Sequence, residues 1–75
     1  MRDYKNLQGQ SGVKRYAIAD DAMLVEFNRG GIYLYTAAMI GEEKLEQMKQ
    51  LAEIGQGLNT FISRHVDQAF SHRFD

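Results

Sequence analysis

Tyr33 and Tyr35 are the side chains whose type and spacing most clearly suggest binding chemistry. They follow the turn-forming run Asn28-Arg29-Gly30-Gly31, and residues two apart in a strand share a face of the sheet. Exposed tyrosines stack on nucleic-acid bases, and each stack contributes about 1–3 kcal/mol. Arg15, predicted to lie on the same face, would bind phosphate. The alternatives are that the rings pack over Leu24 and Ala17 or form a protein or homodimer interface.

Two more polar residues of a predicted second helix are candidate binding residues. Asn59 lies in the first turn, where its amide either bonds local backbone or contributes to a binding site. Arg64 lies on the polar side of the helix and would form a positive edge with His72 and Arg73. The alternative is a solvated helix face on which Asp67, three residues after Arg64, partly neutralises it.

The residue types of a catalytic triad occur in Ser63, His65 and Asp67, but their spacing argues against catalysis. Residues two apart on a helix do not face each other. His65 and His72 would lie about 10 Å apart along one helix, too far to bind the same metal ion. The Gly55-Gln56-Gly57 run lacks the Lys and Ser or Thr of a phosphate-binding loop. We therefore predict a non-enzymatic protein without metal or cofactor.

Length and composition indicate one small domain of ordinary globular type. The chain has 75 residues, 44% of them apolar, 25% charged and none cysteine, which excludes disulfides and thiolate catalysis. The longest strictly apolar run is residues 37–40, so we expect no membrane span and a cytoplasmic location. The net charge of −1 gives no global case for nucleic acid. Residues 1–15 are basic and residues 20–53 acidic, which suggests an anionic partner or simply a solvated tail.

Three alternating segments, residues 12–19, 22–28 and 31–36, predict an antiparallel three-stranded meander. Two-residue turns would gather the following side chains on one face: Tyr16, Ile18, Met23, Val25, Phe27, Ile32 and Leu34. The opposite face would carry Val13, Arg15, Ala17, Leu24, Glu26, Tyr33 and Tyr35. A slip of one residue would invert this assignment.

Two helices are predicted after the meander, and both should pack on its first face. Residues 42–54 place Leu45, Met48, Leu51 and Ala52 at helical spacing, and Gly55 is suited to end that helix. Residues 57–70 carry the apolar stripe Leu58, Phe61, Ile62, Val66, Ala69 and Phe70. Residues 1–10 show no periodicity and predict a flexible arm before a single α+β domain, residues 11–75.

The chain resembles the KTSC family, short domains found at the C-terminus of some lysyl-tRNA synthetases and as small free-standing bacterial proteins. The resemblance rests on Ser11, Leu24-Val25-Glu26-Phe27, Gly30-Gly31, Tyr33-Leu34-Tyr35, Gly57, Asn59, Ile62 and Phe70. The chain departs from the family pattern in having no proline at the entry to the first helix and Phe70 in place of a tyrosine. The resemblance implies a binding role, and the synthetase context points to RNA.

These patterns together favour a non-enzymatic binding or interaction module. The leading alternative is that the tyrosine-bearing sheet face binds RNA or single-stranded nucleic acid. A homodimer through that open face is a further prediction, and the identity of any protein partner stays open.

Overall fold

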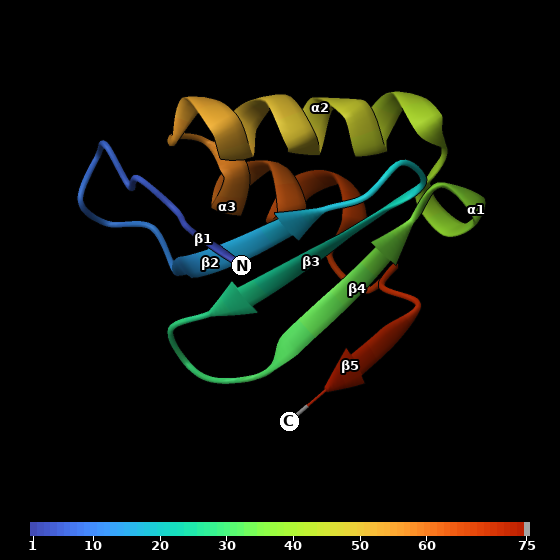
Figure 1. Cartoon of the computed structure of the whole chain (residues 1–75), viewed down its shortest axis with the longest axis horizontal. Coiled ribbons are helices and arrows are strands. Elements are labelled where there is room, and N and C mark those ends of the chain that lie inside the picture. Colours follow the sequence, from blue (N-terminus) through green and yellow to red (C-terminus); the bar gives the residue numbers. More distant parts are fainter. Residues whose placement is uncertain (75) are drawn as a thin grey trace.

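Five antiparallel strands in sequence order form the sheet of the computed structural model, which describes residues 1–74 (Figure 1). The elements are β1 (Arg2–Asp3), β2 (Val13–Ile18), β3 (Ala22–Phe27), β4 (Ile32–Thr36), α1 (Ala37–Ile40), α2 (Glu42–Ile54), α3 (Leu58–Phe61), the π-helical turn η1 (Ile62–Val66) and β5 (His72–Phe74). The α+β class is confirmed, and the predicted meander, β2 to β4, forms the centre of the sheet. No helix among the described residues is long and apolar enough to cross a membrane.

The first hairpin has the predicted register, with Arg15 opposite Glu26 and Tyr16 opposite Val25. A β-bulge between Val13 and Arg15 then adds one residue to β2. The bulge turns Val13 onto the same side as Tyr16, and Val13 is only 2% exposed. The prediction that Val13 shares a face with Arg15 is therefore wrong.

The second hairpin is one residue out of the predicted register, with Glu26 opposite Ile32. The Gly30 N–H donates to the Phe27 carbonyl over 3.0 Å, and the Phe27 N–H donates to the Gly31 carbonyl over 3.3 Å. The loop thus contains three residues rather than two. Such loops end in a residue with positive φ, and Gly30 has a φ of 104°.

This shift of one residue exchanges the two faces of β4. Tyr33 now lies opposite Val25 and Tyr35 opposite Met23, so both tyrosines face the helices. Leu34 lies opposite Leu24 on the other face of the sheet. The prediction that the tyrosines share one face is confirmed, but the prediction that this face is open is wrong.

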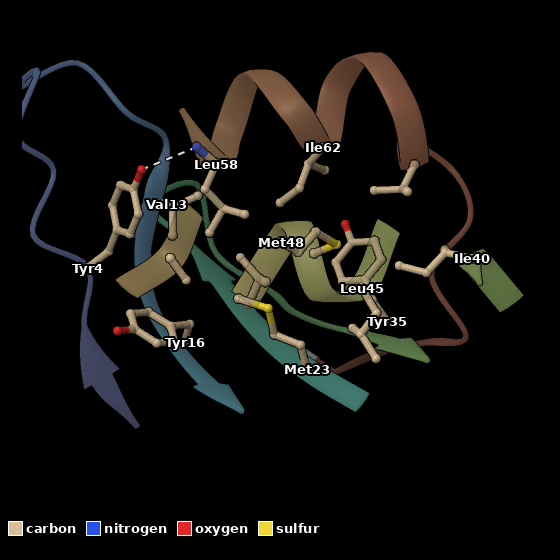
Figure 2. Close-up of a cluster of buried hydrophobic side chains, with 13 residues drawn as sticks. Tyr4, Val13, Tyr16, Met23, Tyr35, Ile40, Leu45, Met48, Leu58 and Ile62 are labelled. Atoms are coloured by element: carbon tan, nitrogen blue, oxygen red, sulfur yellow. Dashed lines mark hydrogen bonds between the residues drawn. The ribbon is translucent and has the colours of Figure 1, made fainter. Parts of the chain in front are cut away.

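Helices α2 and α3 lie side by side over one face of the sheet and enclose the hydrophobic core (Figures 1 and 2). The buried side chains of the helices are Leu45, Met48 and Ala52 of α2, and Leu58, Ile62 and Val66 of α3 and η1. The predicted limits of α2 are confirmed, and Gly55 ends it with a φ of 92°. The second helix ends at Val66 instead of residue 70, because residues 72–74 pair with β4 as a fifth strand.

The N-terminal segment, expected to be a flexible arm, is packed against the domain in the structure. Arg2 pairs with Tyr16 across β1 and β2, and Tyr4 is only 6% exposed. The Leu58 N–H donates to the Tyr4 hydroxyl over 3.3 Å (Figure 2). Periodicity gave no sign of this arrangement because Tyr4 is the only residue of the segment that is buried.

Candidate functional site

A cleft of about 650 Å³ lies between the β3–β4 hairpin and the helical segment formed by α3 and η1. We call it the Tyr35 cleft. Its lining includes Tyr33 and Tyr35 of β4, Asn59 of α3, and Arg29 of the hairpin loop. Its volume is in the range of pockets that bind small ligands.

The polar side of the cleft comes from residues that recur every four positions along α3 and η1. Asn59 and Ser63 both line the cleft, as does Asp67 directly after η1. Side chains four apart lie on one side of a helix. The buried residues Ile62 and Val66 hold the adjacent side against the core. π-helical turns such as η1 are rare and are frequently found at functional sites.

Tyr35 is the most constrained polar residue of the cleft, since only 1% of its surface is exposed. Its ring lies in the core, and its hydroxyl points toward the helix that carries Ile62 (Figure 2). This hydroxyl makes no hydrogen bond to any other residue in the described part of the chain. No fully buried side-chain oxygen or nitrogen of the described residues lacks a partner, so the unpaired Tyr35 hydroxyl reaches the open space of the cleft. It is therefore available to a group that enters the cleft.

Burial, together with smaller contributions from the nearby Tyr33 and Asp67, raises the pKa of Tyr35 to about 12. The hydroxyl is therefore neutral at physiological pH. A neutral hydroxyl can both donate and accept a hydrogen bond.

Aromatic rings form the other side of the cleft. The Tyr33 ring packs edge-to-face on Phe27, with ring centroids 5.2 Å apart, and on Phe70, with centroids 4.8 Å apart. The guanidinium carbon of Arg73 lies 5.3 Å from the centre of the Tyr33 ring. Gly31 leaves room for this arrangement, since a Cβ atom there would lie 3.1 Å from the Arg73 Nε. Tyr33 thus packs on other side chains, but on the covered face of the sheet and not over Leu24 and Ala17, which share the predicted face.

Three of the five predicted site residues, Tyr33, Tyr35 and Asn59, come together in the cleft. Arg15 lies on the opposite face of the sheet, where its Nε is 2.7 Å from a carboxylate oxygen of Glu26. This hydrogen bond lowers the pKa of Glu26 and raises that of Arg15. Arg15 does not share a face with the tyrosines, so the predicted contact surface is wrong.

Arg64 is exposed on η1 and does not line the cleft. No binding role was predicted for other lining residues, notably Arg29, Ser63 and Asp67. The spacing of four from Asn59 to Ser63 to Asp67 is a signal that could have identified two of them. Arg29 comes from a loop that is distant in the sequence, so only the tertiary structure shows that it lines the cleft.

The cleft offers hydrogen-bonding groups, aromatic surface and two arginines, with one carboxylate. His65, which shares η1 with Ser63, is exposed and stacks on Phe61 with ring centroids 4.7 Å apart. Within residues 1–74 no group of three or more histidine, aspartate or glutamate side chains is placed to hold a metal ion. The arrangement is suited to holding a polar ligand that carries a ring or a negative charge.

Comparisons of the chain with models of known protein families, with curated proteins and with solved structures found no match.

Proposed function

We propose that this protein is a non-enzymatic binding module whose ligand occupies the Tyr35 cleft. The observation that carries the proposal is the Tyr35 hydroxyl: the ring is buried in the core, and the hydroxyl reaches the cleft with no partner among the described residues. A hydrogen bond from a ligand to this hydroxyl would contribute about 0.5–1.5 kcal/mol to binding.

Membership of the KTSC family is part of the same proposal. It is supported by the position of Tyr33, Tyr35 and Asn59, three residues of the resemblance that all line the cleft.

Single-stranded nucleic acid, RNA in particular, is the second candidate ligand. The observation in its favour is that Arg29 and Arg73 line the same cleft as Tyr33. Arginine pairs with phosphate through parallel hydrogen bonds, and aromatic rings stack on bases. The contact would be made in the cleft rather than on an open sheet face.

Amide NMR titration with a set of small polar aromatic compounds tests the proposal. In the wild-type protein we expect the shifted amides to cluster at Tyr33, Asn59 and Asp67. Tyr35→Phe keeps the ring and removes the hydroxyl, so it should weaken binding about fivefold, the equivalent of one hydrogen bond. Tyr16→Phe is the matched control, because Tyr16 is also buried in the sheet but does not line the cleft. Shifts that avoid the cleft, or equal binding by both variants, would overturn the proposal.

A further inference from the structure

We infer that the ligand of the Tyr35 cleft is a nucleotide, either free or at the end of a single strand. This inference rests on the proposed function and adds the chemistry of the ligand: a planar ring with hydrogen-bonding edges, joined to a phosphate. Three properties of the cleft point to it, namely its hydrogen-bonding groups, its aromatic surface and its charge.

The hydrogen-bonding groups call for a ligand that both donates and accepts. The neutral Tyr35 hydroxyl and the Asn59 amide can each do both, while the Asp67 carboxylate only accepts. Asn59 is half-buried and its side chain makes no hydrogen bond within the described residues. The edge of a nucleobase carries donors and acceptors, and asparagine and carboxylate side chains are among those that pair with such edges.

The aromatic surface favours a flat ligand. Phe27, Tyr33 and Phe70 form a continuous chain of edge-to-face contacts and all three line the cleft. These contacts fix the rings, so a ligand that stacks on them does not have to order flexible side chains. A nucleobase has a flat π-face of this kind, and such stacking tolerates any base.

The charge of the cleft favours an anion. The lining holds two arginines, Arg29 and Arg73, and one acid, Asp67, although the whole chain carries −1. Arg29 is exposed on the hairpin loop and is the arginine expected to contact a phosphate. The position of Arg73 over the Tyr33 ring keeps its guanidinium at the cleft. The planar fork of arginine matches the oxygens of a phosphate group.

A bound peptide is the main competing ligand, and the strand pairing argues against it. Peptides commonly add to a sheet by pairing with a free strand edge. The strand that lines the cleft, β4, is already paired with β3 on one side and with β5 on the other. A peptide in this cleft therefore finds no free edge of β4 to pair with.

The test is an NMR and calorimetric titration of the full chain with the four nucleoside monophosphates, their nucleosides and inorganic phosphate. We expect the monophosphates to shift the cleft amides and to bind about tenfold more tightly than the nucleosides, the contribution of one charge-assisted contact. Arg29→Gln should abolish this advantage, and Arg29→Lys should keep part of it. Arg64→Gln is the matched control, since it removes a charge from η1 outside the cleft and should keep the full advantage.

Two results would overturn the inference: nucleosides that bind as tightly as nucleotides, or nucleotides that leave the cleft amides unshifted. If the small aromatic compounds still bind in the cleft, the proposed function stands and only the nucleotide inference fails. If nothing shifts those amides, both fail. A short RNA with a terminal phosphate distinguishes the two sources: tighter binding than the monophosphate supports a strand end, and equal binding supports a free nucleotide.

Discussion

A tyrosine whose ring lies in a small hydrophobic core limits the pH range over which the protein is stable. The ring of Tyr35 fills space between β4 and the helices, which explains why an aromatic residue is useful there. A phenylalanine would fill the same space without a polar atom. The hydroxyl therefore adds nothing to packing, which agrees with the role proposed for it in the cleft.

The pH dependence of stability should reveal this buried hydroxyl. The pKa of Tyr35 is about 12 in the folded protein, above the value near 10 of an unfolded chain. Below about pH 10 the hydroxyl is protonated in both states and the full stability is present. Between about pH 10 and pH 12 only the unfolded state loses the proton, so the free energy of unfolding falls.

Urea denaturation of the wild type and of Tyr35→Phe across this pH range provides the measurement. Other tyrosines and the lysines titrate in both proteins, so the difference between the two curves isolates Tyr35. We expect the stability of the wild type to fall more steeply than that of the variant. Parallel curves would show that the hydroxyl is not buried in solution.

At the scale of elements, long periodic segments were predictable and short loops were not. The strands β2 to β4 alternate apolar and polar residues and the helix α2 buries side chains at helical spacing, so the sequence alone located all four to within a residue or two. The register of the second hairpin depends on whether its loop has two residues or three. Gly30-Gly31 is compatible with a two-residue or a three-residue loop, and the choice decides which face carries the tyrosines.

The terminal strands could not be predicted for a different physical reason. β1 and β5 contain two and three residues, too few for an alternating pattern. They are strands because β2 and β4 offer free edges to them. The Tyr35 cleft was only partly predictable for the same reason, because it joins a loop, a strand and a helix that are distant in the sequence.

The close contact between the end of α2 and the N-terminal segment can be tested by mutation. Gly55 has a φ of 92°, and a Cβ atom there would lie 2.6 Å from the Cβ of Lys5. Gly55→Ala should destabilise the protein by more than the roughly 1–2 kcal/mol of a left-handed alanine, because the N-terminal segment must also move. Gly57→Ala is the control, since Gly57 is also left-handed, with a φ of 84°, and its added Cβ would meet only Leu51, at an ordinary 3.6 Å. Equal unfolding free energies for the two variants would contradict this packing.

On the scale of the whole molecule, one face of the sheet is covered and the other is open. The open face carries Leu24, Leu34 and Ile32 beside the paired Arg15 and Glu26. The predicted homodimer through the open face therefore stays a prediction, but it would use these side chains and not the tyrosines. Light scattering over a range of concentrations would detect it.

The N-terminal segment contributes to the stability of the whole domain through Tyr4. Tyr4→Ala should lower the free energy of unfolding by about 3 kcal/mol, the usual cost of deleting a buried aromatic ring. Tyr4→Phe should cost only about 1 kcal/mol, because it removes the hydrogen bond from the Leu58 N–H and keeps the ring. Leu7→Ala, at a residue that is 63% exposed, should have little effect. If Tyr4→Ala is as stable as Leu7→Ala, residues 1–10 form the flexible arm that the sequence suggested.

The two short outer strands also affect how the protein behaves in a crowded solution. β1 and β5 cover the sides of β2 and β4, which are longer and more apolar. Loss of β1 or β5 would leave a longer strand with unpaired N–H and C=O groups at the edge of the sheet. Such an exposed strand is a template for pairing with other chains, the first step toward aggregation. The two short strands thus shield the more apolar strands from edge-to-edge pairing.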